Sequence, residues 1–190
     1  MTLAIEPVTP KRWGDLEALF GPNGAYSGCW CMFFRQTSAE FPAKAGKKNR
    51  TELKTLVERR RVPGLLAYVD EEPAGWVSIA PRRQFGRIER SPILKPVDDA
   101  AAWSIVCLFI GKRFRRQGLG RALVDAAVRY AVDKGAEAIE AYPIDTARNP
   151  RELSSAELFV GTAAMFRKAG FKVVARHKDA RPIMRYAAPR

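Results

Sequence analysis

The stretch FRRQGLGRALVDAAVRYAVDKG, residues 114–135, joins a glycine-containing turn to a long alanine-rich segment. Apolar residues recur from Leu119 to Ala131 at the spacing of one helix face, and Gly135 follows where a C′ glycine belongs. Arginines at positions 115, 116 and 121 surround the expected start of this helix. A helix N-terminus already carries a partial positive charge, so arginines there, with glycines at 118 and 120, predict an anion-binding site.

A nearly continuous apolar run, AAWSIVCLFI at residues 101–110, directly precedes this segment and is typical of a strand buried on both faces.

Asn49, with Glu52 three residues later, resembles a helix-capping box. The other expected elements are helices at 10–20, 49–61 and 158–170, a hairpin at 65–81, and strands at 3–8, 136–144, 171–176 and 182–187. Helices that interrupt the strands this regularly predict an α/β (α+β) domain around one mixed sheet.

Two common phosphate-binding motifs do not fit the glycine turn. A dinucleotide-binding fingerprint needs G-x-G-x-x-G directly after the first strand, whereas these glycines follow the fourth expected strand with a different spacing. A Walker A loop needs G-x-x-x-x-G-K-[ST], which the sequence lacks. The turn therefore belongs to another class of anion site.

The segment LFIGKRFRRQGLGRALVDAAVRYA (108–131), the strand before it and the later turn AMFRKAGF (164–171) together resemble the GNAT superfamily of N-acetyltransferases. The resemblance covers residues 65–176 well and the first quarter of the chain only in general layout. It implies one domain over residues 1–190, with a mixed, mostly antiparallel central sheet flanked by helices. Residues 1–64 would form a strand and helices on the acceptor side, and residues 65–176 the acetyl-CoA-binding core.

The resemblance also implies a function. A GNAT enzyme moves an acetyl group from acetyl-CoA to a primary amine by direct transfer in a ternary complex; the sequence does not identify the acceptor, which is either a small molecule or a protein. The backbone of Leu108, Phe109 and Ile110 would pair with the pantetheine arm of the coenzyme. The residues expected to bind the pyrophosphate are Arg115, Arg116, Gln117, Gly118, Leu119, Gly120 and Arg121.

The catalytic residues expected from the family pattern are absent from their usual places. Many relatives carry a tyrosine in the last helix, but Phe166 stands there and cannot donate a proton. An asparagine often found earlier in that helix is replaced by Phe159. Coenzyme A is a tolerable leaving group, so the rate can rest on positioning, with water as the proton acceptor.

Three other polar residues are weak candidates for proton transfer. Tyr142 follows the fifth expected strand, Ser104 lies where some relatives carry a glutamate base, and Glu140 lies close by in the linear map. Asp145 and Glu89 are further carboxylates in the same regions. Each of these groups can equally be structural, and the sequence does not rank them.

The loop AYSGCWCMFF (25–34) is rich in aromatic residues and precedes the second expected helix. Tyr26, Trp30, Phe33 and Phe34 can line a pocket for an amine with an aromatic or apolar edge. They can also form a second layer of the core, which is the more common role of such residues. The sequence favours the core over the pocket.

The net charge of +13, from 33 Lys and Arg against 20 Asp and Glu, favours polyanionic partners. A basic nucleic-acid-binding module is therefore one alternative function, although the arginine clusters at 59–61, 82–83 and 112–116 are separated in sequence. A second alternative is a coenzyme-binding sensor or scaffold without activity, because the usual tyrosine is missing. Many GNAT proteins are dimers, so a homodimer is compatible with the resemblance.

Three cysteines and one histidine predict no metal site, because Cys29 and Cys31 have no second pair and His177 lies far away in the sequence. An odd cysteine count also predicts no disulfide framework. No apolar run approaches the roughly 18 residues of a membrane span, and the N-terminus lacks the apolar region of a signal peptide. We therefore expect a cytoplasmic protein.

Overall fold

The computed structural model describes residues 2–149, 151–154 and 156–189. In this part of the chain, seven strands form one sheet in the order β1-β2-β3-β4-β5-β7-β6. The parallel pair is β4 with β5, and the other neighbouring pairs are antiparallel. The strands are β1 (Leu3–Pro7), β2 (Gly64–Val69), β3 (Glu72–Pro81), β4 (Ala102–Ile110), β5 (Ala138–Ala141), β6 (Lys172–Ala175) and β7 (Ile183–Ala187). The mixed, mostly antiparallel sheet expected from the sequence is confirmed.

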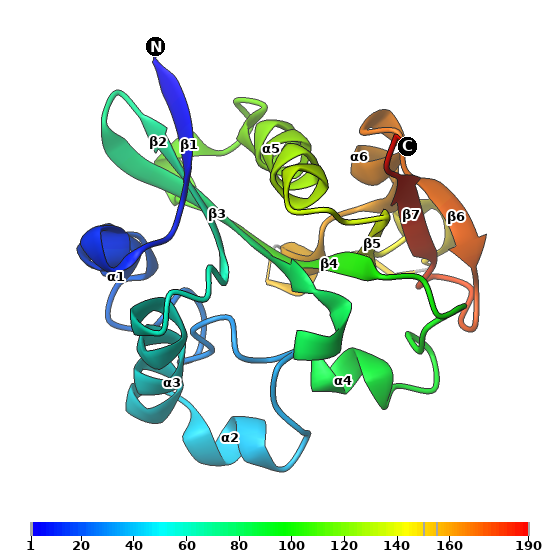
Figure 1. Ribbon diagram of the computed structural model, residues 1–190, viewed down its shortest axis with the longest axis horizontal. Helices are drawn as coiled ribbons and strands as arrows, with labels where there is room; N and C mark the ends of the chain where they lie inside the picture. Colours follow the sequence, from blue (N-terminus) through cyan, green and yellow to red (C-terminus); the bar gives the residue numbers. More distant parts are fainter. Residues whose placement is uncertain (1, 150, 155, 190) are drawn as a thin grey trace.

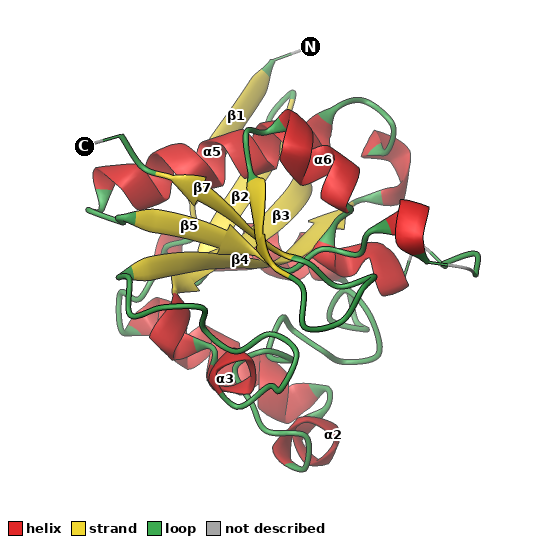
Figure 2. Cartoon of the chain, turned by 90° about the vertical axis from the view of Figure 1, so that its right-hand side faces the viewer, coloured by secondary structure: helices red, strands yellow, loops and turns green. Residues whose placement is uncertain are grey.

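Helices cover both faces of the sheet (Figures 1 and 2). α5 (Leu119–Asp133) and α6 (Ala163–Lys168) lie on one face, where Leu123, Ala127 and Phe166 are fully buried. The opposite face carries the N-terminal helices, whose Leu16 and Leu53 pack in one cluster with Trp76 of β3. The helices on this face are α1 (Trp13–Phe20), α2 (Glu40–Lys44), α3 (Lys47–Glu58) and α4 (Gly86–Glu89).

The α5 helix follows the pattern read from its sequence. It begins after Gly118, with φ +79°, and ends before Gly135, with φ +81°, the left-handed conformation that favours glycine. Its buried positions include Val124 and Val128 beside the expected alanines and leucines. The helix therefore packs a wide apolar face onto the sheet. No helix of the described residues is long and apolar enough to cross a membrane.

The single helix expected over residues 158–170 is wrong. A 3₁₀ turn at Glu157–Val160 comes first, and α6 begins only at Ala163. Gly161 separates the two with φ +75°, and the Thr162 hydroxyl accepts a hydrogen bond from the Met165 N–H at 3.3 Å. An N-cap and a left-handed glycine end one element and begin another, although the apolar spacing continues through both.

The capping box expected at Asn49 is also wrong. The α3 helix begins at Lys47, so Asn49 lies inside it and is fully buried. Its side chain accepts a hydrogen bond from Gln36 at 2.8 Å and donates one to the Gly28 carbonyl at 3.2 Å. Asn49 therefore fixes the loop of residues 28–36 against α3 instead of closing the helix start.

Candidate active site

The β4 and β5 strands diverge in the middle of the sheet. β5 pairs with β4 only over Ala102–Ile105, while β4 continues to Ile110. The pairing with β3 passes from Cys107 to Ile105, so Val106 bulges out of the ladder. Within the described residues, no strand pairs with the other edge of β4 beyond Ile105. Apart from the Ile110 carbonyl, which accepts from Arg115, the outward backbone groups of this edge have no strand partner among the described residues and are available to an extended ligand.

The turn into α5 starts where this edge ends. Arg116 has φ +62° and Gly118 has φ +79°, so two left-handed residues bend the chain just before the helix. Such bends, followed by the first N–H groups of a helix, gather backbone donors around one point. The turn therefore brings several N–H donors together, and the anion site predicted from its sequence stays a prediction.

The fold explains the glycine at 118 but not the glycine at 120. A side chain at Gly118 would be strained by its positive φ. At Gly120 a Cβ would lie 3.4 Å from the Ile110 side chain and 3.5 Å from the Met165 sulfur, which is ordinary contact. The neighbours in the folded chain therefore leave room for a Cβ at 120 and do not by themselves require a glycine there.

The arginines around the turn differ in their partners. Arg115 is exposed, and its Nε donates to the Ile110 carbonyl at 3.2 Å, so its guanidinium lies over the end of β4. Arg116 is exposed to solvent. Arg121 donates to both carboxylate oxygens of Asp125, at 2.8 and 2.7 Å, and to the Lys168 carbonyl. Arg121 therefore links α5 to the end of α6.

The three candidate catalytic residues lie together, fully buried between β4 and β5. The Tyr142 hydroxyl is 3.0 Å from the Ser104 hydroxyl and donates to Glu140 at 2.9 Å. Glu140 also forms ion pairs with Arg82 at 3.3 Å and Arg185 at 2.6 Å. Burial, together with the charge of Glu140, raises the pKa of Tyr142 well above its ordinary value. The polar atoms of this cluster are thus engaged with one another, and the tyrosine keeps its proton at neutral pH.

The other two carboxylates are also engaged in ion pairs. Asp145 is buried and binds Arg167 at 2.9 Å and Arg176 at 2.7 Å. Glu89 lies 3.4 Å from the Arg82 Nε. Both carboxylates therefore connect elements of the fold.

An apolar pocket of about 260 Å³ lies against the outer half of β4. The sequence left two roles open for the aromatic residues of this loop, pocket wall and core. Tyr26, Phe33 and Phe34 line the pocket, and Trp30 belongs to the core with Trp13 and Phe20. The aromatic wall of the pocket consists of Tyr26, Phe33, Phe34, Phe41, Phe109 and Phe159.

Sequence reasoning missed two of these wall residues. Phe41 belongs to a short helix with no periodic pattern, and Phe159 was expected inside a longer helix. Both rings lie close to Phe33, with centroids 5.2 and 5.9 Å away. The signal available was the number of aromatic residues in segments without regular spacing, which does not by itself reveal that they converge.

The three cysteines line the same pocket. The Cys31 sulfur is 3.1 Å from that of Cys107 and accepts a hydrogen bond from the Trp76 indole at 2.9 Å. Burial raises the pKa of Cys29 to about 11 and that of Cys31 well above its ordinary value. Cys29 and Cys31 are therefore protonated at neutral pH and contribute an apolar, unreactive surface.

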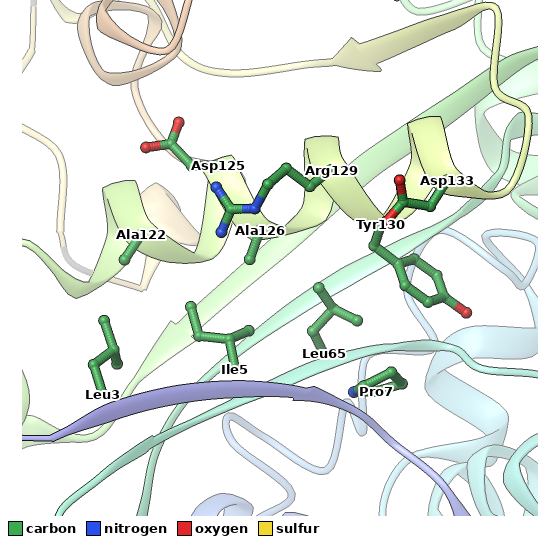
Figure 3. A pocket seen from close by; sticks show the side chains of 10 residues that line it. All are labelled: Leu3, Ile5, Pro7, Leu65, Ala122, Asp125, Ala126, Arg129, Tyr130 and Asp133. Atoms are coloured by element: carbon green, nitrogen blue, oxygen red, sulfur yellow. The ribbon is translucent and has the colours of Figure 1, made fainter.

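A wider hollow of about 480 Å³ lies between β1 and α5 (Figure 3). Leu3 and Ile5 project from β1 toward the helix, and Asp125, Arg129 and Asp133 lie along its rim. Residues 115–120 of the turn and the free edge of β4 do not line this hollow. The candidate site is therefore the region where the turn, the free edge and the aromatic pocket meet.

Comparisons with known proteins agree with this placement of the elements. The profile of the Acetyltransferase (GNAT) family matches residues 30–157. No protein of curated function matches the sequence. A PaiA N-acetyltransferase from Thermoplasma acidophilum, solved in complex with coenzyme A, has a TM-score of 0.56 at 14% identity, over 98% of this chain and 99% of that one.

Two further solved structures have the same fold at low identity. An N-acetyltransferase from Staphylococcus aureus gives a TM-score of 0.57 at 12% identity and covers 100% of both chains. An acetyltransferase from Thermus thermophilus gives 0.52 at 20% identity, over 98% of this chain and 97% of that one. The family profile spans well over half of the sequence and the folds agree, so the chain belongs to the GNAT family of acetyltransferases.

Proposed function

We propose that this protein transfers an acetyl group from acetyl-CoA to a primary amine, by direct attack in a ternary complex. The observation that carries the proposal is the turn at residues 115–120, which opens α5 beside the unpaired edge of β4. A pyrophosphate needs the charge and the N–H donors of the turn, and an extended pantetheine arm needs the free edge. The aromatic pocket beyond that edge supplies a dry place for the acceptor.

The coenzyme residues follow from this arrangement. The backbone of Leu108–Ile110 would pair with the pantetheine amides, and the N–H groups of Leu119 and Gly120 would point at the pyrophosphate. Arg115, Arg116 and Gln117 would add side-chain donors, while Arg121 adds its charge from its position on Asp125. Residues 65–176 would thus form the coenzyme-binding core, and residues 1–64 the acceptor side of one domain.

In the proposed mechanism, the neutral amine attacks the thioester carbonyl and the carbon–sulfur bond breaks. The amine loses a proton to water, and the coenzyme leaves as thiolate or thiol. Positioning of the two substrates supplies the rate enhancement. Ser104, Glu140 and Tyr142 support this by holding β5 against β4 at the point of divergence, because their hydrogen bonds join the two strands.

A thiol-release assay tests the proposed function. The purified protein is incubated with acetyl-CoA and a broad panel of amines, and free coenzyme A is measured against an amine-free control. We expect release above background hydrolysis with at least one amine, and mass spectrometry should find the acetylated amine. Binding of acetyl-CoA without transfer to any amine would contradict the proposal.

A non-catalytic coenzyme sensor is the second candidate function. Phe166 favours it, because this side chain is fully buried against Phe171, with ring centroids 5.1 Å apart, and offers no hydroxyl to the sulfur. The same assay separates the two functions. A sensor would bind acetyl-CoA and leave every amine unmodified.

A further inference from the structure

The aromatic pocket has the size of a site for a small molecule. Its volume of about 260 Å³ lies below the roughly 300–1,000 Å³ typical of pockets for drug-sized ligands. The rings of Phe34 and Phe41 meet Phe33 edge-on, with centroids 5.0 and 5.2 Å away. These contacts fix the aromatic wall, and the ring faces and edges that line the cavity favour contact with an aromatic ring. The pocket therefore fits a body of one or two rings.

Two guanidinium groups, of Arg87 and Arg35, lie behind the pocket wall. The Arg87 guanidinium lies 4.1 Å from the Phe33 ring centroid and donates to the Phe33 and Thr37 carbonyls. Arg35 lies 4.6 Å from the centroid of Phe85 and acts electrostatically on Cys31 of the wall. Burial lowers the pKa of Arg35 to about 10, so it stays protonated at neutral pH. An ammonium ion in the pocket would lose its hydration and would be repelled by these two guanidinium groups.

The described pocket lining is aromatic, aliphatic, thiol or small hydroxyl in character. An alkylamine resembles the lysine side chain, with a pKa near 10.4, so roughly one molecule in 2,500 is uncharged at pH 7. An amine attached directly to an aromatic ring is neutral at that pH, because its lone pair is delocalised into the ring. Such an amine enters the pocket and attacks without first losing a proton to a base.

We propose that the acceptor is a weakly basic aromatic amine, in which the nitrogen is bonded directly to the ring. This inference rests on the proposed acetyl transfer at the same site. The ring lies among Phe33, Phe41 and Phe159, and the nitrogen faces the end of the coenzyme at β4. The nitrogen attacks the thioester carbon, the carbon–sulfur bond breaks, and the proton lost by nitrogen passes through water to the thiolate. The products are an anilide and coenzyme A.

Three amines test this assignment with the full-length protein: aniline, benzylamine and cyclohexylamine. Aniline and cyclohexylamine have nearly the same size and differ in basicity, whereas benzylamine combines an aromatic ring with a basic nitrogen. We expect kcat/KM at about pH 7 to be at least about tenfold higher for aniline than for either basic amine. Between about pH 7 and pH 9, the value for aniline should stay nearly constant, while those for the basic amines rise as they lose their protons.

Substitutions of the aromatic residues that line the pocket test whether the ring of the amine binds there. Phe159→Leu and, in case that variant does not fold, Phe41→Leu should raise KM for aniline several-fold without changing the affinity for acetyl-CoA. Val174→Ala, at an exposed position of β6, is the control and should change neither value. Unchanged aniline kinetics in both wall variants would overturn the assignment.

The outcomes distinguish this inference from the proposed function. Efficient transfer to cyclohexylamine or benzylamine with little transfer to aniline would overturn the aromatic-amine assignment and leave acetyl transfer standing. Absence of transfer to every amine, with acetyl-CoA still bound, would overturn both. Transfer to aniline that the wall variants weaken supports both.

Discussion

Gly118 and Gly120 are two glycines of the same turn whose backbone conformations differ. Gly118 has a positive φ that a larger residue would adopt only with strain. Gly120 has room for a Cβ, and its role in coenzyme binding is part of the proposed function. The neighbouring Arg115 reaches over the end of β4 from the same turn. These residues form the part of the site with the strongest sequence signal.

Replacement of Arg115 by alanine should weaken acetyl-CoA binding about ten- to a hundredfold, because a charge-assisted hydrogen bond to phosphate contributes roughly 1.5–3 kcal/mol. Calorimetric titration measures this loss. Arg113→Ala is the matched control, since it removes the same charge from the same loop, but from a side chain that forms an ion pair with Glu72. Equal loss of affinity in both variants would mean that net charge, and not the position of Arg115, matters.

At this scale the sequence predicted the glycine turn and the start of α5, and it offered the aromatic pocket only as the less favoured alternative. The turn consists of consecutive residues, so its glycines and arginines are visible in one short segment. The pocket joins rings from residues 26–41, from β4 and from Phe159, and tertiary packing decides which rings face the cavity. Trp30 lies in the same loop and is buried in the core instead, a difference that spacing does not encode.

Among the secondary-structure elements, the long strands and α5 follow from periodicity, whereas the region after β5 does not. A continuous apolar pattern over residues 158–170 predicts one helix, but Gly161 and the Thr162 cap divide it. The division places the 3₁₀ turn against β4 and so brings Phe159 to the pocket. Local capping and close packing beside Leu108 decide this outcome, since a side chain at 161 would clash with its neighbours.

Asp145 ties these elements together through Arg167 of α6 and Arg176 after β6. Asp145→Asn leaves both arginines without their charge partner, and we expect a loss of about 2 kcal/mol. This is less than the 3–5 kcal/mol of fully buried pairs, because both arginines are partly exposed. Thermal melts should show a fall in Tm of roughly 4–8 °C. Asp179→Asn, which removes a surface partner of Arg148, is the control and should change Tm little.

The pH dependence of the Tm provides a second test of the ion pairs that Asp145 forms with Arg167 and Arg176. Burial opposes the charge of Asp145, but the Arg176 hydrogen bond and the Arg167 charge outweigh it and lower the pKa. Because the pKa is lowered in the folded state, the stabilisation is present above about pH 4, the ordinary range of aspartate, and is lost as the pH falls further. The Tm difference between wild type and Asp145→Asn should therefore shrink below about pH 4. A difference that stays constant into acid would contradict an electrostatic role.

At the scale of the whole molecule, the net charge of +13 raises the alternative of a nucleic-acid-binding module. Many arginines are engaged in ion pairs with carboxylates of other elements, among them Arg50 with Glu17 and Arg185 with Asp98. The first pair joins α3 to α1 and the second joins β7 to the connection before β4, so these arginines are less available to a polyanion.

We therefore expect weak and salt-sensitive binding to DNA or RNA. Fluorescence anisotropy with labelled duplex DNA and single-stranded RNA, at about 0.15 M salt, should show no tight complex. A titration of the same protein with acetyl-CoA is the positive control for folded material. Tight nucleic-acid binding at this salt concentration would restore the basic module as a competing function.

The most direct test of the account compares two glycine-to-aspartate variants by calorimetric titration with acetyl-CoA. Gly120 and Gly14 are each the second residue of a helix, and neither has a positive φ. A Cβ at Gly14 would meet nothing within 4 Å, and one at Gly120 would make ordinary contacts at 3.4 and 3.5 Å. Both variants add one negative charge, and both should melt close to wild type. We predict that Gly120→Asp loses acetyl-CoA binding, because its carboxylate lies where the pyrophosphate must approach, and that Gly14→Asp binds as wild type does. Wild-type affinity in a folded Gly120→Asp variant would contradict the placement of the coenzyme at the start of α5.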